Sequence, residues 1–164
     1  MKILAFASAV LMLATSASGQ QQKASPKDSA MGTNVKVVYS KPSKNGRLIF
    51  GGLVPYGQVW RTGANEATEI TFDKDGSFGG KPVKAGTYTL WTIPGEKEWS
   101  VILNSDTKFW GTQYDKHKDK DVLKVEVPSK ATGDEVEKFT IRFAGKNMIM
   151  EWDKTQVAVP VVVK

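Results

Sequence analysis

One short segment of the chain gathers several side chains that bind polar groups. The run 60–66, WRTGANE, places an aromatic ring, a guanidinium, an amide and a carboxylate within seven positions: Trp60, Arg61, Asn65 and Glu66. Its central Thr-Gly-Ala lets the backbone turn and brings these groups close together on a loop. Such groups orient a sugar, a carboxylate or a phosphate, so the segment predicts a ligand site. In the structural alternative, Arg61 pairs with Glu66, Asn65 occupies a turn position with positive φ, and Trp60 lies in the core.

Two further aromatic residues and the use of arginine extend this candidate site. Of the 23 basic residues only three are arginines, and Arg47 and Arg61 both fall in the Gly-rich stretch 45–67. A guanidinium fork costs more to place than an ammonium, which favours a specific partner there. Tyr56 and Trp110 are expected to offer rings on which a ligand stacks. The predicted ligand-binding residues are Tyr56, Trp60, Arg61, Asn65, Glu66 and Trp110.

Carboxylate catalysis is the second function that the sequence allows. Glycoside cleavage uses two acids at a defined separation, and the fold would have to bring a second acid to Glu66. The conceivable partners are Glu69, Glu151 and Asp153. We expect binding rather than catalysis and assign no catalytic residue. The alternatives are a hydrolase acting on an envelope glycan and a structural or partner-binding protein of the envelope.

Metal and cofactor chemistry finds little support in the sequence. The chain has no cysteine and one histidine, His117, so a zinc site of several nitrogen and sulfur ligands cannot be assembled. Lysines flank His117 on both sides, which predicts an exposed loop. Three nearby aspartates lack the distal glutamate of a calcium loop: Asp115, Asp119 and Asp121. We therefore expect no metal and no cofactor.

The first residues have the layout of a secretory signal peptide. Lys2 precedes an apolar run, and small residues follow up to Gly19, which predicts cleavage near Gly19. The apolar run is shorter than the roughly 20 residues that span a bilayer, so no stable membrane insertion is expected after cleavage. The expected location is the periplasm or the extracellular medium. Without cysteine, disulfides and lipid attachment through an N-terminal cysteine are excluded.

The charge pattern bears on the partner. The formal net charge is +6, but the lysines are scattered among acids and form no basic stripe. Readers of nucleic acid use clustered basic residues and arginine forks, so no nucleic-acid partner is expected. The expected partner is a small polar or carbohydrate-like ligand.

Apolar and polar residues alternate with a period of two from about residue 34 onward. The apolar segments recur between Gly, Pro, Asp and Asn, and no long amphipathic helical window appears. This predicts an all-β fold, an antiparallel two-sheet β-sandwich, jelly-roll-like, of roughly eight to ten strands, with a closed barrel as the alternative. The clearest element is a hairpin of residues 87–93 and 99–103 around Pro94 and Gly95.

The chain divides into three parts. Residues 1–19 are the predicted signal peptide, and residues 20–33 are polar without periodicity, which predicts a flexible entry segment. Residues 34–164 are expected to form a single β-sandwich domain. Within it, the Asp-Gly pair at 75–76 predicts a hairpin turn. Three tryptophans at apolar strand positions are expected in the core: Trp91, Trp99 and Trp152.

Residues 46–68 read GRLIFGGLVPYGQVWRTGANEAT, and this stretch resembles the signature of an uncharacterised bacterial family of secreted domains of unknown function. The likeness continues along the chain through KPVKAGTYTLWTIPG (81–95), WGTQYD (110–115) and MEWD (150–153). The resemblance implies a secreted single domain. It implies no activity and no catalytic residue.

Overall fold

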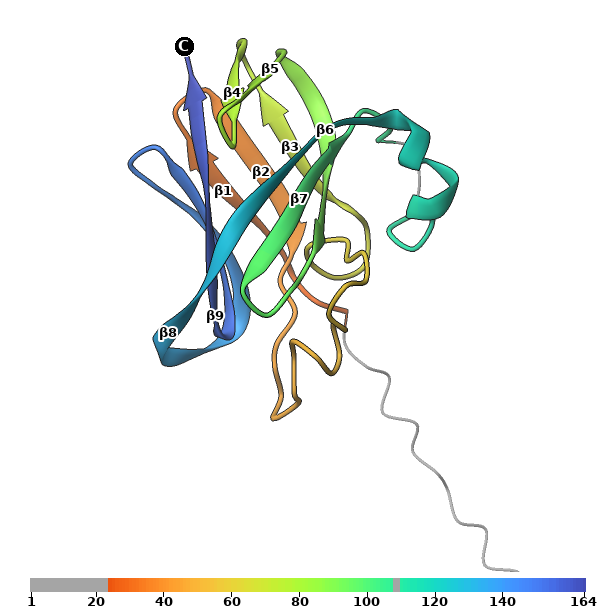
Figure 1. Ribbon diagram of the computed structural model, residues 1–164, viewed down its shortest axis with the longest axis vertical. Helices are drawn as coiled ribbons and strands as arrows, with labels where there is room; N and C mark the ends of the chain where they lie inside the picture. Colours follow the sequence, from red (N-terminus) through yellow and green to blue (C-terminus); the bar gives the residue numbers. More distant parts are fainter. Residues whose placement is uncertain (1–23, 108–109) are drawn as a thin grey trace, which may run out of the picture.

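The computed structural model describes residues 24–107 and 110–164, which fold as an antiparallel β structure, as predicted (Figure 1). The strands are β1 (Lys27–Gly32), β2 (Val35–Ser40), β3 (Thr68–Phe72), β4 (Gly76–Phe78), β5 (Lys81–Val83), β6 (Gly86–Ile93), β7 (Glu98–Asn104), β8 (Asp121–Ala144) and β9 (Asn147–Val163). Two single 3₁₀ turns, η1 (Tyr114–Lys116) and η2 (Lys118–Lys120), connect β7 to β8. No helix in the described ranges is long and apolar enough to cross a bilayer.

The nine strands form one continuous sheet in the order β1-β2-β3-β6-β7-β8-β9-β4-β5. Strand β8 changes partner along its length: residues 121–128 pair with β7, and residues 129–144 pair with β9. Register breaks between Ala131 and Val136, and again before Thr140, bend this long strand. The sheet therefore folds over on itself, so that β1, β2 and β3 face the second part of β8 together with β9 (Figure 1).

The core lies between the two facing halves of this sheet. Alternation on β2 buries Val35, Val37 and Tyr39, as the period of two predicts. The Tyr39 ring meets the edge of Phe139 with centroids 5.6 Å apart, and its hydroxyl accepts a hydrogen bond from the Ile141 amide at 3.0 Å. The core thus joins strands β2 and β8 through packing and through a buried polar contact.

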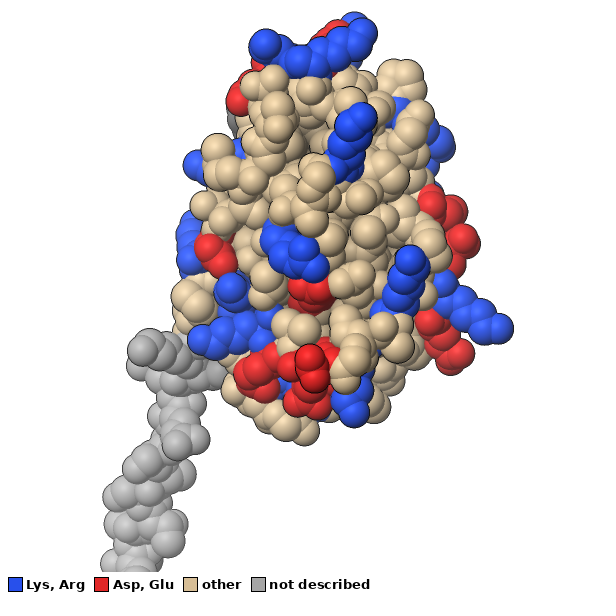
Figure 2. Space-filling view, turned by 90° about the vertical axis from the view of Figure 1, so that its left-hand side faces the viewer, with Lys and Arg blue, Asp and Glu red and all other residues tan. Residues whose placement is uncertain are grey.

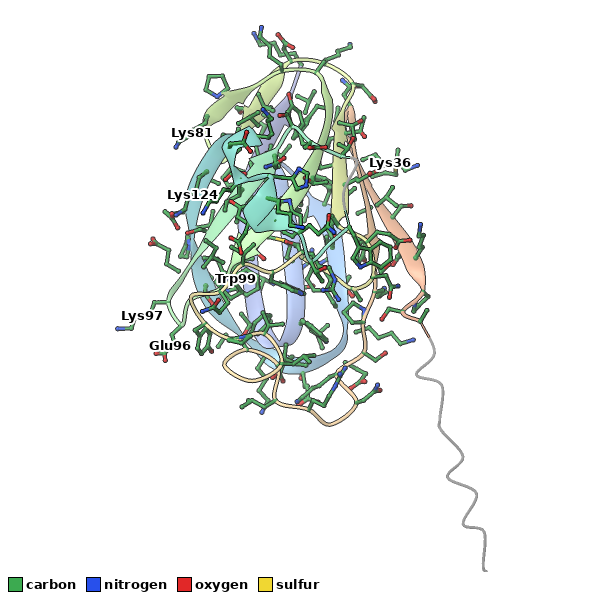
Figure 3. The ribbon with its side chains drawn as sticks, turned by 90° about the vertical axis from the view of Figure 1, so that its right-hand side faces the viewer. Lys36, Lys81, Glu96, Lys97, Trp99 and Lys124 are labelled. Atoms are coloured by element: carbon green, nitrogen blue, oxygen red, sulfur yellow. The ribbon has the colours of Figure 1, made fainter. Side chains whose placement is uncertain are left out.

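The tryptophans predicted for the core are all buried, although they occupy two places. Trp99 and Trp152 belong to the central core, and Figure 3 shows Trp99 directed into the interior while Lys97 and Glu96 point outward. Trp91 lies outside that cluster and packs against Tyr114, with ring centroids 5.1 Å apart. The segment that holds η1 therefore covers the outer face of β6.

Two sequence predictions about local structure are wrong. Residues 27–32, expected within a flexible entry segment, form strand β1 on the edge of the sheet, paired with β2. The burial of this strand alternates, but Ala30 is its only buried residue and most of its residues are polar or small, so the sequence shows no apolar alternation. The turn before Gly76 joins no hairpin, because β3 pairs with β2 and β6 while β4 pairs with β5 and β9. The predicted signal peptide and residues 20–23 lie outside the described residues.

The surface mixes charges of both signs. Figure 2 shows basic and acidic side chains interspersed over one face of the molecule. Ion pairs join several charged side chains of the described residues, as in the contacts of Lys44 with Glu135 at 2.6 Å and with Asp153 at 2.8 Å. The acids in these pairs partly neutralise the lysine that they contact.

Candidate ligand-binding site

The loop that contains the predicted site runs over residues 41–67 from β2 to β3, at one end of the folded sheet (Figure 1). It is anchored at Trp60, whose amide donates to the Thr92 carbonyl at 2.7 Å and whose carbonyl accepts from the Thr92 amide at 3.0 Å. Three fully buried threonines fix the bend that follows: the hydroxyls of Thr62 and Thr92 lie 3.1 Å apart, and Thr68 Oγ1 donates to the Thr62 carbonyl at 2.7 Å. The backbone around Arg61 is thus held between β3 and β6.

A recess of about 480 Å³ opens beside this bend. Its lining combines a half-buried cation, a second arginine and an apolar wall, and no acidic residue is among the described residues that form it. The lining residues are Ser25, Pro42, Arg47, Leu53, Val54, Trp60, Arg61, Gly63, Ala64, Asn65 and Trp152. The volume lies in the range of small-molecule sites.

Arg61 supplies a cation that the described part of the chain leaves unpaired. Its Nε is fully buried without a hydrogen-bond partner, and no salt bridge within residues 24–107 and 110–164 involves its guanidinium. Burial lowers the pKa of Arg61 from its ordinary value, because the charged form loses solvation. The buried Nε is closed to a ligand, but the two Nη groups are not among the fully buried unpaired atoms, so an anion placed in the recess would pair with them.

Arg47 is the second cation of the recess, and its orientation is fixed by the backbone. Its Nε donates to the Lys44 carbonyl at 2.9 Å, and its Nη2 donates to the Ser43 carbonyl at 2.6 Å. Both acceptors are neutral, so these bonds hold the fork in place without cancelling its charge. The recess therefore carries two guanidinium groups with no carboxylate in its described lining.

Two tryptophans form an aromatic wall of the recess. The rings of Trp60 and Trp152 lie 19° from parallel with centroids 5.8 Å apart. Trp60 is buried, and its Nε1 donates to the Gly63 carbonyl at 3.0 Å, so its only indole N–H is already used. Trp60 therefore belongs to the core, as the structural alternative holds, and it presents only a margin of its ring to the recess.

Asn65 also has a structural task. Its Nδ2 donates to the Ser25 carbonyl at 3.0 Å and to Ser40 Oγ at 3.2 Å, and its backbone has φ of 57°. Both amide protons are thus used to hold the start of the described chain against the bend. Only its Oδ1 is left for a ligand.

The other three predicted site residues lie outside this recess. Glu66 pairs with Lys27 at 3.4 Å rather than with Arg61, so the expected ion pair does not form. Glu66 and Lys27 line a separate recess of about 130 Å³. Tyr56 is 41% exposed and packs on Gly51, while Trp110 is 55% exposed. The structure therefore brings together Trp60, Arg61 and Asn65, and leaves Tyr56, Glu66 and Trp110 apart from them.

The acids proposed as partners of Glu66 are engaged elsewhere, apart from Glu69, which lines the small recess with it. Glu151 accepts a bidentate pair from Arg142, at 3.0 and 2.9 Å, and Asp153 pairs with Lys44 at 2.8 Å. A hydrogen bond from its own amide lowers the pKa of Glu66, whereas a general acid needs a raised pKa.

His117 lies between η1 and η2, which contain no buried residue, in agreement with the predicted exposed loop, but its side chain is held in place. Its Nδ1 lies 2.9 Å from Asp106 Oδ2, and its carbonyl accepts a hydrogen bond from the Asn104 side chain at 2.7 Å. The residue therefore helps to dock η1 and η2 on the end of β7. Among the described residues, no group of three His, Asp or Glu side chains is placed to hold a metal ion.

Several lining residues were outside the predicted set. Ser25 precedes β1, Leu53 lies on the same loop as Trp60, and Trp152 comes from β9 at the far end of the chain. Only Arg47 left a signal, since it is one of three arginines and shares the Gly-rich stretch with Arg61. The other contributions arise from the meeting of elements distant in sequence, which no local pattern encodes.

The chain belongs to a family described as a protein of unknown function, DUF2911, whose model matches residues 21–161. The match covers nearly all of the described fold, including the loop 41–67 and both parts of strand β8. The chain matches no curated protein and no solved structure.

Proposed function

We propose that this protein is an exported, non-catalytic binding domain whose recess between Arg47, Arg61 and the tryptophan wall holds a small polar ligand with an anionic group. The observation that carries the proposal is the half-buried Arg61 guanidinium, which has no acceptor among the described residues. A carboxylate or phosphate would accept two parallel hydrogen bonds from such a fork. The protein thus supplies a positioned guanidinium with which an anionic ligand would form an ion pair.

The polarity of the recess favours an anion over a neutral sugar. Hydroxyl groups of a sugar donate as well as accept, and a site for them needs acceptors as well as donors. Here both charged lining residues, Arg47 and Arg61, are cations, and the side-chain acceptors in the lining are limited to Asn65 Oδ1 and the Ser25 hydroxyl. A carbohydrate-like ligand would fit best if it carries a carboxylate or phosphate.

One observation speaks for the hydrolase alternative, since Glu66 and Glu69 line the same small recess, and several speak against it. Glu66 lies outside the recess of Arg61, its pKa is lowered, and Glu151 is held by Arg142. We infer also that the segment 46–68 is the signature of the family, since it supplies most of the recess. The protein would be located in the periplasm or the extracellular medium, after cleavage of the signal peptide near Gly19.

Thermal unfolding of the protein recovered after expression tests the binding proposal. At constant ionic strength, inorganic phosphate and benzoate should raise the melting temperature, whereas glucose should not, because a ligand at ~100 Kd stabilises the folded state by about 2.7 kcal/mol. Arg61→Met should abolish the shift. Lys97→Met, which removes an exposed cation elsewhere, should retain it. Equal shifts in wild type and Arg61→Met would contradict the proposal, and an N-terminus still at Met1 would contradict export.

A further inference from the structure

We propose that the ligand is amphiphilic: its anionic group binds Arg61 and Arg47, and an apolar group attached to it lies against Leu53 and Val54. This inference rests on the proposed function and adds the chemical class of the ligand, an organic carboxylate or phosphate ester with an apolar part. It follows from the composition of the recess and from the way in which Leu53 is held.

The lining of the recess includes apolar residues that have no role in binding an inorganic anion. Beside the two arginines, its lining includes apolar residues of the loop 41–67 and of β9, among which Leu53 is largely exposed while Val54, Trp60 and Trp152 are buried: Pro42, Leu53, Val54, Trp60, Ala64 and Trp152. An apolar group that displaces water from this surface lowers the free energy of the complex, whereas an inorganic phosphate would leave the surface in contact with water. Charge and apolar surface are therefore presented to the same volume of about 480 Å³.

Leu53 is the apolar residue that extends from the recess to the surface. It lines the recess and is 48% exposed. The loop around it is rigidly bonded, because the Leu53 amide donates to the Leu48 carbonyl at 3.0 Å and the Gly51 amide donates to the Val54 carbonyl at 2.9 Å. Buried Ile49 and Val54 anchor the same loop in the core. The exposed leucine is thus fixed in place as a preformed wall.

This arrangement predicts how affinity depends on the ligand. Each methylene that leaves water for the wall beside Leu53 should tighten binding about fourfold. The gain should stop when the chain reaches beyond the recess. A neutral molecule with the same apolar part should bind at least about tenfold more weakly, because it leaves the half-buried Arg61 guanidinium without an anionic partner.

A homologous series of unbranched carboxylates tests the inference. Calorimetric titrations with acetate, butanoate, hexanoate and octanoate, below micelle formation and at constant ionic strength, are compared with titrations of hexanol and hexylammonium. Affinity should rise with carboxylate length, hexanol should bind weakly and hexylammonium should not bind. Leu53→Ser should flatten the dependence on chain length while the binding of acetate persists.

The matched control is Leu48→Ser. Leu48 is 68% exposed on the same loop but does not line the recess, so its replacement should leave the whole series unchanged. If Leu48→Ser weakens hexanoate as much as Leu53→Ser does, the carboxylates adsorb to apolar surface in general and the inference fails.

The outcomes separate this inference from the proposed function. If acetate and phosphate bind and Arg61→Met abolishes their binding, but affinity is flat along the series, the recess is an anion site and the amphiphilic ligand is ruled out. If none of the soluble anions binds, both proposals fall. If the protein binds vesicles that contain anionic lipid but binds no soluble carboxylate, its partner is a membrane surface and not a small molecule in the recess. This result would also overturn the inference.

Discussion

Gly111 packs against Arg61 so closely that a β-carbon on Gly111 would lie 2.6 Å from Arg61 Cδ. The segment after β7 therefore packs against the Arg61 side chain and helps to hold it in position. The same β-carbon would meet the Asn65 carbonyl oxygen at 2.9 Å and the Ala67 amide nitrogen at 3.1 Å. Glycine is required here by close approach to backbone atoms.

Gly111→Ala should therefore destabilise the protein and disturb the recess. Two of the three neighbours are backbone atoms that cannot rotate away, so we expect a loss of about 1–3 kcal/mol in the free energy of unfolding. Gly133→Ala is the control, because a β-carbon at Gly133 meets nothing within 4 Å. Urea denaturation of both variants measures the difference. Equal stability of the two would show that the segment at Gly111 yields easily.

Arg61→Met and Arg47→Met should affect stability differently. Arg61 makes no hydrogen bond with the described residues, so Met should keep its apolar packing and change the free energy of unfolding by less than about 1 kcal/mol. Arg47→Met removes two hydrogen bonds to carbonyls and should cost about 1–3 kcal/mol. Denaturant titration without ligand compares them. A larger loss in Arg61→Met would make Arg61 a structural residue.

Asn65 combines a tether and a turn conformation, and two substitutions separate them. Asn65→Gly keeps access to φ of 57° but loses the hydrogen bonds to Ser25 and Ser40, whereas Asn65→Ala loses both. Asn65→Ala should be the less stable variant by about 1 kcal/mol. In both, amide exchange near Ser25 should quicken. Unchanged exchange in Asn65→Gly would show that the side chain does not hold this segment.

Tyr39 should make stability fall at alkaline pH. Burial raises the pKa of Tyr39 to about 12. The phenol of the unfolded chain titrates near ~10, so between these values the folded state binds more protons, and the free energy of unfolding falls as the pH rises. Below pH ~10 this contribution is fully present. Tyr39→Phe should lack this part of the decline, which denaturation at several pH values measures. Parallel curves for both proteins would contradict the assignment.

Tyr39→Phe also removes the acceptor of the Ile141 amide, so the variant should be less stable already at neutral pH. A buried amide left without a partner costs about 1–3 kcal/mol. The hydroxyl's other contact, to Asp28 at 3.2 Å, is only partly buried and should add little.

Glu66→Gln should leave ligand binding and stability nearly unchanged. The carboxylate lies outside the recess, and its pair with Lys27 is exposed, so little depends on its charge. Calorimetric titration with benzoate measures the first effect and urea denaturation the second. Loss of an enzymatic activity on glycans in this variant would instead favour the hydrolase.

The fold class was predictable from the sequence because alternation and turn residues act locally. The hairpin of β6 and β7 is confirmed, with Thr92 opposite Val101. The length of β8 was not predictable, because its two parts pair with different strands and only the assembled sheet makes them one element. Strand β1 was missed for a related reason: β2 supplies its hydrogen bonds, while its sequence KDSAMG has no alternation of apolar and polar residues.

The candidate site was predictable only in part. The run 60–66 identified Arg61, because arginine is rare in this sequence and this one lies next to an aromatic residue and close to a glycine. It could not place Glu66, because the left-handed backbone at Asn65 turns the following side chain toward Lys27. Likewise, no local signal links Trp152 to Trp60, which meet only after β9 has joined β8.

Strands β4 and β5 have a further consequence for how the chain comes apart. They lie in sequence between β3 and β6, but β4 pairs with the end of β9. The half of the sheet formed by β8 and β9 therefore includes a hairpin whose sequence lies within the other half. No single cut in the backbone can release that half as an intact piece. Heating should accordingly melt the protein in one calorimetric transition, with fragments unable to persist alone.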